Sequence, residues 1–242
     1  MSAEANVDAA EIDHFDAFGD DWWRTDGSFR TLHDINPARV DFIRERLTLT
    51  GSAGVDVGCG GGILTEALAR GGATMVGIDM SQGALAAAKA HADQGPALPI
   101  RYEQSTAEDF AERHARAFDF VTCLEMLEHV PEPAAVVAAC AALVRPGGHV
   151  FFSTLNRTPK AYALAVLGAE YVLRLLPRGT HDYGRFLKPS EIDASARHVG
   201  LSLLDLRGMH YDPLSRRARL TEDVSVNYLA AYELSPSDGF SA

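Results

Sequence analysis

Residues 55–62 of the chain have the sequence VDVGCGGG, and a second apolar stretch ends about 20 residues later in Gly77, Ile78 and Asp79. A short apolar strand that runs into clustered glycines, followed at once by a helix, is typical of the first turn of an open α/β sheet. The glycines allow a tight turn and let a ligand approach the main chain, and ligands bind such sheets at the carboxyl ends of the strands.

The segments around this turn alternate between strand and helix. Strands are predicted at 55–57, 73–78, 100–104, 118–124 and 150–154, and helices at 63–70, 82–91 and 134–144. This alternation predicts a parallel sheet with helices on both faces. It stops after residue 156, and a helix at 189–199 and strands at 201–207 and 227–234 complete the chain.

We therefore expect an N-terminal helical cap over residues 1–50 and one α/β domain over residues 51–242, with residues 157–188 inserted as a helical lid. The cap is polar, but Trp22 with Trp23 and Phe42 with Ile43 should pack it against the domain.

The composition narrows the classes of function. Hydrophobic residues make up 47% of the 242 positions, as in ordinary globular proteins, and the formal net charge of −11 argues against nucleic acid as the main partner. The first residues are acidic, unlike a signal or transit peptide, and no apolar run reaches the roughly 18 residues that would span a membrane. Three cysteines without a CxxC pair indicate reduced thiols and a cytoplasmic location.

The glycine turn is compatible with two cofactors. Asp79 has the separation from Gly58 expected of a carboxylate that binds ribose hydroxyls, which suits NAD and S-adenosylmethionine alike. Asp56 favours S-adenosylmethionine, because it would repel a pyrophosphate but attract an ammonium group. The glycines also depart from GxGxxG, since position 63 is Ile. A dinucleotide-dependent oxidoreductase and a glycine turn without a ligand are the alternatives.

Two further segments should lie at the same sheet edge. The strand at 118–124 ends at Leu124, whose side chain should contact the ligand together with Gly58 and Gly60 of the glycine turn. Residues 106–109 follow the third strand and should cover the adenine.

These segments together resemble the class I methyltransferases, and longer strings resemble the O-methyltransferases of ubiquinone biosynthesis. The strings are LHDINP at 32–37, VGCGGGIL at 57–64, EMLEHVP at 125–131, FFSTLNR at 151–157, GAEY at 168–171, PRGTHD at 177–182 and VNY at 226–228. The resemblance implies a Rossmann-like fold with a seven-stranded, mostly parallel sheet. It also implies methyl transfer to two acceptors, a 2-polyprenyl-6-hydroxyphenol and a 3-demethylubiquinol.

The resemblance assigns S-adenosylmethionine contacts to Arg39, Gly58, Asp79 and Leu124, with Arg39 on the methionine carboxylate. It also brings a divalent-metal hypothesis, because eukaryotic relatives carry the pattern Glu-x-x-Glu-His, which residues 125–129 reproduce here.

The expected chemistry needs an ionised phenol. With a pKa of about 10, only about one phenol in a thousand is ionised at pH 7, so its deprotonation must be assisted. His129, with Glu128 beside it, could act as general base. Alternatively, a Mg²⁺ ion bound by Glu125, Glu128 and His129 could chelate two catechol oxygens. The i, i+3, i+4 spacing of these three residues predicts that their side chains lie on one face of a helical turn. A third interpretation is that Glu128 and His129 only cap a helix or contact the cofactor.

The insertion resembles a membrane-surface helix. Residues 159–188 carry a net positive charge, with Leu164, Leu167, Tyr171 and Leu175 at helical spacing and Arg174 and Arg178 on another face. We expect it to bind anionic lipid, which would place the protein peripherally at the inner membrane, near a polyprenylated substrate. The alternative is a lid packed over the active site. His181 and Asp182 in this segment are candidates for positioning substrate.

Two other functions remain open from the sequence. One is methylation of a different small phenol or amine, which would need no prenyl chain. The other is a non-catalytic S-adenosylmethionine-binding partner within a ubiquinone-biosynthesis complex.

Overall fold

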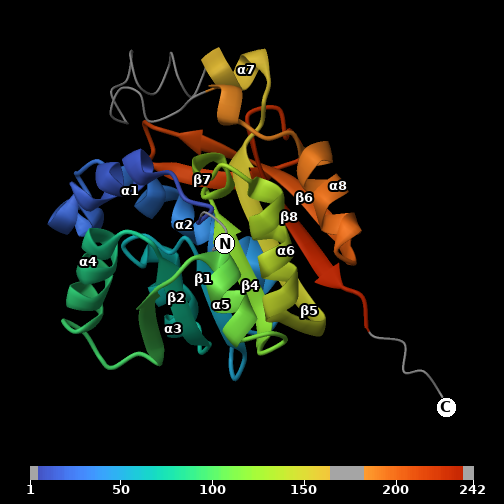
Figure 1. Cartoon of the computed structure of the whole chain (residues 1–242). Helices are drawn as coiled ribbons and strands as arrows, with labels where there is room; N and C mark the ends of the chain where they lie inside the picture. Colours follow the sequence, from blue (N-terminus) through green and yellow to red (C-terminus); the bar gives the residue numbers. More distant parts are fainter. Residues whose placement is uncertain (1–4, 164–182, 237–242) are drawn as a thin grey trace.

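The structure is a computed structural model that describes residues 5–163 and 183–236. Its centre is a sheet of eight strands in the order β3-β2-β1-β4-β5-β8-β6-β7 (Figure 1). Strands β3, β2, β1, β4 and β5 run parallel, whereas β8 pairs antiparallel with both β5 and β6. The strands are β1 (Ala53–Val57), β2 (Thr74–Asp79), β3 (Ile100–Gln104), β4 (Phe118–Leu124), β5 (Val144–Leu155), β6 (Leu201–Asp212), β7 (Arg217–Thr221) and β8 (Asn227–Leu234).

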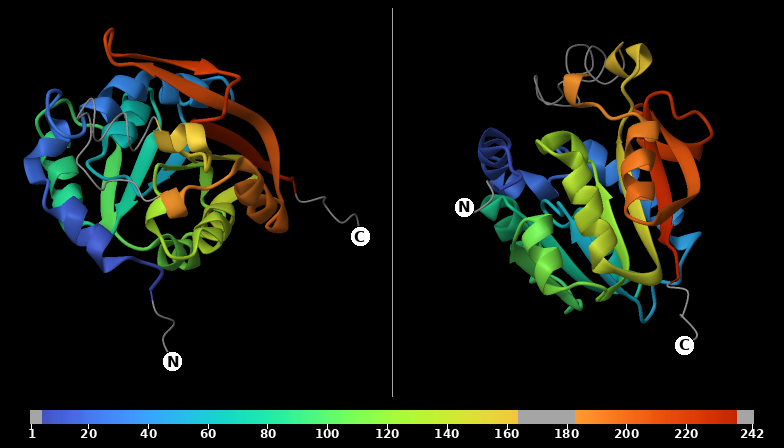
Figure 2. Two further views of the ribbon diagram at one scale, coloured as in Figure 1. Left: turned by 90° about the horizontal axis from the view of Figure 1, so that it is seen from above. Right: turned by 45° about the vertical axis from the view of Figure 1, so that its right-hand side comes forward.

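Helices cover both faces of the sheet, which confirms the predicted Rossmann-like α/β class. Helices α5, α6 and α8 lie on one face, and α2 and α3 lie on the other (Figures 1 and 2). The α-helices are α1 (Ala9–Asp16), α2 (Arg30–Arg44), α3 (Ile63–Arg70), α4 (Gln82–Ala92), α5 (Ala107–Arg113), α6 (Pro133–Leu143), α7 (Pro159–Ala161) and α8 (Pro189–His198). Short 3₁₀ turns are η1 (Gly19–Trp23), η2 (Leu127–His129) and η4 (Tyr183–Arg185).

The central strands divide the core into two layers because successive side chains point to opposite faces. In β4, Val121 and Cys123 pack into the cluster under α5 and α6, while Phe120 and Leu124 pack into the cluster under α2 and α3. Both faces are apolar, as expected for a parallel sheet that is buried on both sides.

The N-terminal segment packs against the rest of the chain through the four residues predicted from the sequence. Phe42 and Ile43 of α2 are fully buried in the same cluster as residues of α3, β5 and β8. The Trp22 ring stacks on Phe29 with centroids 3.7 Å apart, and the Trp23 Nε1–H donates to the Gly61 carbonyl at 2.8 Å.

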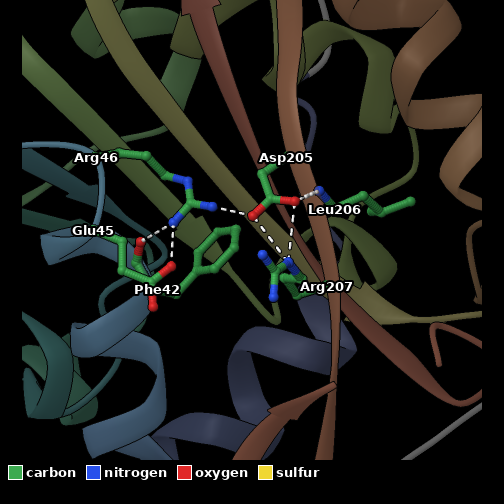
Figure 3. Close-up of polar contacts among 6 residues, drawn as sticks. All are labelled: Phe42, Glu45, Arg46, Asp205, Leu206 and Arg207. Atoms are coloured by element: carbon green, nitrogen blue, oxygen red, sulfur yellow. Dashed lines mark hydrogen bonds and ion pairs between the residues drawn. The ribbon is translucent and has the colours of Figure 1, made fainter. Parts of the chain in front are cut away.

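A charged cluster joins the end of α2 to β6 (Figure 3). The Arg46 guanidinium lies over the Phe42 ring, donates to the Phe42 carbonyl at 3.1 Å, and pairs with Asp205. Asp205 also accepts from the Arg207 Nε–H at 3.1 and 3.2 Å. The N-terminal segment is thereby connected to the part of the sheet built from the end of the chain.

The structure extends the expected sheet by one strand. The strand predicted at 201–207 continues to Asp212 and folds back as β7, so the sheet has eight strands and not seven. Strand β7 escaped prediction because its sequence, RARLT, is polar and half exposed at the sheet edge. Helix α5 was likewise not predicted from the sequence. The proposed amphipathic helix, with Arg174 and Arg178, and the pair His181 and Asp182 lie outside the described residues. Among the described helices, none is long and apolar enough to cross a membrane.

Candidate active site

A cavity of about 670 Å³ opens at the carboxyl ends of the parallel strands. Residues that directly follow β1, β2, β3 and β4 line it, as the α/β topology predicts. All nine site residues predicted from the sequence line this one cavity: Arg39, Asp56, Gly58, Gly60, Asp79, Leu124, Glu125, Glu128 and His129. Thr106 and Glu108, from the segment expected to cover the adenine, line it too.

Two glycines of the β1–α3 turn cannot be replaced without a clash. Gly58 and Gly60 have φ values of +71° and +51°, in the left-handed region. A Cβ on Gly58 would lie 2.4 Å from Met126 Cγ, and one on Gly60 would lie 2.5 Å from Trp22 Cη2. The turn therefore packs closely against two residues of the cavity lining and has no room for side chains at these two positions.

The carboxylate of Asp79 is fixed at the end of β2 by main-chain donors. Its Oδ2 accepts from the Gly60 N–H and its Oδ1 from the Ser81 N–H, both at 2.8 Å. Burial raises the pKa of Asp79, and these bonds oppose that shift. One side chain thus ties the glycine turn to the start of α4, beside the cavity.

Asp56 is a buried carboxylate next to the glycine turn. Thr65 donates to its Oδ2 at 2.6 Å and Thr122 donates to its Oδ1 at 2.7 Å. Burial raises its pKa to about 6, although the two hydroxyl bonds and the charge of Arg39 act in the opposite direction. The group therefore changes charge just below neutral pH.

Arg39 of α2 is only 5% exposed, yet its Nε and Nη2 atoms have no hydrogen-bond partner. Its Nη2 lies 3.3 Å from Glu125 Oε1, close enough for an ion pair but without hydrogen-bond geometry. A buried guanidinium with unused donors beside a cavity is suited to binding a carboxylate ligand.

The geometry after β4 corrects one prediction. Glu125, Glu128 and His129 do not share one face of a helical turn, because Glu125 has a φ of +54° and η2 contains only residues 127–129. The Glu125 carboxylate is instead turned toward β5, where the Ser153 hydroxyl donates to its Oε1 at 2.6 Å. Within the described residues there is no group of three His, Cys, Asp or Glu side chains placed to hold a metal ion.

Glu128 and His129 have shifted proton affinities. Burial, reinforced by the charge of Glu125, raises the pKa of Glu128 to about 7, and its buried Oε2 has no hydrogen-bond partner. Burial alone would lower the pKa of His129. The hydrogen bond that the His129 ring donates to Glu11, together with the charges of the nearby carboxylates, outweighs burial, so the pKa of His129 lies above its ordinary value. Glu128 can therefore exchange a proton near neutral pH, and His129 holds a proton more tightly than a free imidazole does.

Residues from distant parts of the chain, which the sequence motifs do not indicate, also enclose the cavity. Glu11, Phe15 and Trp22 line it from the N-terminal segment, and Met209 and Tyr211 line it from β6. The sequence indicated that Trp22 and Trp23 pack against the domain, but it did not indicate that Trp22 lines the cavity. No local pattern marks Glu11 or β6 as part of a site.

Comparisons with known proteins agree with this geometry. Residues 55–152 match the family model described as a methyltransferase domain. The chain is 54% identical over 225 residues to the ubiquinone biosynthesis O-methyltransferase of Pseudomonas savastanoi pv. phaseolicola, covering 93% of this chain and 97% of that protein. It is 55% identical over 226 residues to the protein of the same name from Nitrosococcus oceani, covering 93% and 95%.

A solved structure shares the fold at lower sequence identity. Magnesium protoporphyrin IX methyltransferase from Synechocystis PCC 6803, with bound SAH, superposes with a TM-score of 0.69 at 21% identity, covering 93% of this chain and 99% of that one. At this identity the likeness concerns the fold alone.

Proposed function

The chain belongs to the ubiquinone biosynthesis O-methyltransferases, and from that membership we propose how its cavity performs the transfer. The enzyme moves a methyl group from S-adenosylmethionine to a phenolic hydroxyl of polyprenylated catechol and demethylubiquinol intermediates. The observation that carries the site assignment is that one cavity gathers Arg39, Asp56, Asp79 and His129 at the carboxyl edge of the sheet.

The cofactor would bind along the ends of β1 and β2. Asp79 would accept from the ribose hydroxyls, Asp56 would bind the ammonium, and the unused donors of Arg39 would bind the carboxylate. The glycine turn supports this placement, since side chains at Gly58 and Gly60 are excluded. The negative charges of Asp56 and Asp79 would also repel the pyrophosphate of a dinucleotide, which argues against the dinucleotide-dependent oxidoreductase considered from the sequence.

The acceptor would occupy the other end of the cavity. The strand order continues from β4 to β5, β8 and β6, and these strands contribute Leu155, Met209 and Tyr211 to the lining. Ile35 and Val226 add to this largely apolar wall. Such a wall suits a phenol ring with an attached prenyl chain.

The protein's chemical task is to hold the phenol in line and remove its proton. S-adenosylmethionine, when bound, supplies the methyl carbon, and its sulfur leaves with the electron pair of the carbon–sulfur bond. We assign the proton to His129 Nε2, from which it passes to solvent, with the adjacent Glu128 stabilising the imidazolium. The phenolic oxygen uses the freed electron pair to form the new bond to carbon.

The alternative is a Mg²⁺ ion on Glu125, Glu128 and His129. The described residues do not fit it, because Glu125 is bonded to Ser153 and lies beside the cation of Arg39. We therefore derive no step through a metal. Turnover measured with and without a chelator tests this conclusion. Full turnover in the presence of the chelator supports proton removal by His129. Loss of turnover that Mg²⁺ restores would overturn it.

The activity is tested by methyl transfer from labelled S-adenosylmethionine to a short-prenyl demethylubiquinol and to the matching catechol. Transfer to both acceptors is the expected result. Equal transfer to a phenol without a prenyl chain would favour the alternative acceptor class. Binding of S-adenosylmethionine without any transfer would favour a non-catalytic role in a biosynthetic complex.

We further propose that the enzyme works in the cytoplasm, attached peripherally to the inner membrane. The support is the basic, partly apolar sequence of residues 159–188 in a chain whose net charge is −11. We expect co-sedimentation with anionic vesicles that weakens with salt and on replacing Arg174 and Arg178 by Glu. Equal binding to neutral vesicles, or no effect of the substitutions, would contradict the proposal.

A further inference from the structure

Helix α1 lies over the cavity, where polar contacts hold both of its ends and Phe15 packs against the cluster that contains Trp22. None of the residues of α1 is buried. At its end, Asp16 Oδ1 accepts from the Ser81 hydroxyl at 2.5 Å and from the Gly83 N–H at 2.8 Å. Before its start, the Asn6 side chain donates to Glu108 Oε1 at 2.8 Å. Figure 1 shows α1 at the end of the sheet where α7 also lies, above the carboxyl ends of the strands.

One side chain of α1 reaches the proposed base. Glu11 Oε2 lies 3.0 Å from His129 Nδ1, although the two residues are 118 positions apart in the chain. The Phe15 ring, one turn further along α1, contacts the imidazole edge to face at a centroid distance of 5.3 Å. Helix α1 therefore fixes both the hydrogen bonding and the orientation of the ring.

This contact selects the form of the imidazole. A carboxylate accepts hydrogen bonds, so Nδ1 carries the hydrogen and the lone pair of the neutral ring lies on Nε2. Within the part of the chain that the structure describes, Nε2 has no hydrogen-bond partner. The charged groups that face the ring are Glu11 from α1 and Glu125 and Glu128 from the segment after β4. The Arg185 Nη1 donates to the other carboxylate oxygen of Glu11, Oε1, at 3.2 Å.

We propose that Glu11 is a positioning residue of the transfer reaction, which holds His129 with Nε2 directed to the acceptor hydroxyl. The inference rests on the proposed role of His129 as base. Helix α1 then has two roles, because it lines the cofactor cavity and also orients the base His129.

A different role for Glu11 must be distinguished, because it also pairs with Arg185. Asp8 provides the matched control: it pairs with Arg185 at 2.8 Å and caps α1 by accepting from the Ala10 N–H, but it does not contact His129. In Asp8→Asn the cap is kept, since Asn caps helices as well as Asp, and the charge toward Arg185 is lost.

The test measures steady-state methyl transfer to the short-prenyl demethylubiquinol and SAH binding in the full-length enzyme. In Glu11→Gln the amide can donate to Nδ1 and move the imidazole hydrogen to Nε2. We expect kcat to fall about 100-fold, within the range of general-base contributions, with KM and the SAH Kd changed by less than about threefold. Glu11→Asp should recover part of kcat, and Asp8→Asn should stay within about threefold of the wild type. The nitrogen chemical shifts of His129 should report Nδ1–H in the wild type and Nε2–H in Glu11→Gln.

Two further variants separate this inference from the proposed function. His129→Gln should lose kcat to at least the same extent, and Glu11→Gln combined with His129→Gln should be no slower than His129→Gln alone. Wild-type activity in His129→Gln would overturn the base assignment itself. Loss in His129→Gln with wild-type kcat in Glu11→Gln, or additive losses in the double variant, would overturn the role of Glu11 alone.

Discussion

At the scale of single residues, the site combines ionisable groups whose charge is set by burial. Asp56 is enclosed at the end of β1, and its two hydroxyl partners only partly offset the cost of removing a carboxylate from water. Its pKa of about 6 means that the free enzyme loses the charge under mildly acidic conditions. A cationic ligand would stabilise the ionised form, so ligand binding and proton release should be linked.

We therefore predict that S-adenosylmethionine binds more weakly as the pH falls through 6. The ammonium binds the ionised carboxylate, whose fraction is near 1 at pH 7 and about one tenth at pH 5, so the apparent Kd should rise about tenfold between these values. Titration calorimetry measures the Kd, and buffers of different ionisation enthalpy reveal proton release. Asp56→Asn should bind weakly with a flat pH profile; the wild-type profile in that variant would assign the dependence to another group, such as Asp79.

The predicted site residues that line the cavity include three that lie at the end of a strand. Asp56, Asp79 and Leu124 each end or nearly end a parallel strand, and topology alone brings strand ends to one edge. Sequence reasoning did not identify Glu11 and Tyr211, which reach the cavity through packing between distant segments. No periodicity in the sequence encodes such contacts.

At the scale of elements, helices and strands were predicted more accurately than the short turns that connect them. The helices and parallel strands have strong apolar patterns, and most lie within a few residues of the predicted ranges. The turn after β4 differs because Glu125 takes a left-handed conformation at φ +54°, which the i, i+3, i+4 spacing cannot reveal. The turn between β1 and α3 was predicted because clustered glycines are typical of positions with positive φ.

We predict that Gly60→Ala destabilises this turn by more than backbone strain alone. Alanine at a left-handed φ costs about 1–2 kcal/mol, and here its Cβ would also meet the Trp22 ring, which is held by stacking on Phe29. Gly147→Ala is the matched control, since Gly147 also has a positive φ, of +75°, but open space around its Cβ position.

Urea unfolding should give a larger loss of unfolding free energy for Gly60→Ala than for Gly147→Ala, and only Gly60→Ala should weaken SAH binding. Equal losses with unchanged binding would show that the Trp22 contact is easily relieved and that the turn does not form the cofactor wall.

At the scale of the whole molecule, the cavity depends on segments from both ends of the chain. Its lining runs from Asn6 in the N-terminal segment to Asn227 in β8. The same segments share hydrophobic clusters: Ile35 and Phe42 from the expected cap pack with Leu68 of α3 and Leu229 of β8. Residues from the predicted cap, 1–50, therefore pack into one hydrophobic cluster with residues from the predicted domain, 51–242.

This joint packing predicts that the N-terminal segment does not unfold separately. The chain has only two tryptophans, Trp22 and Trp23, and both lie in η1, so their fluorescence reports on how the N-terminal segment packs against the rest of the chain. Far-UV circular dichroism reports on the helices and the sheet throughout. We expect the two urea transitions to coincide, and SAH at about 100 times its Kd to stabilise both by about 2.7 kcal/mol.

A fluorescence transition at lower urea than the dichroism transition would contradict this prediction, because it would mean that the N-terminal segment opens while the sheet stays folded. The ligand distinguishes the remaining cases. A shift of the dichroism transition without a shift in fluorescence would mean that SAH binds without engaging Trp22. Equal shifts of coincident transitions are expected if the segment that carries Glu11 and Trp22 is an integral wall of the cofactor cavity.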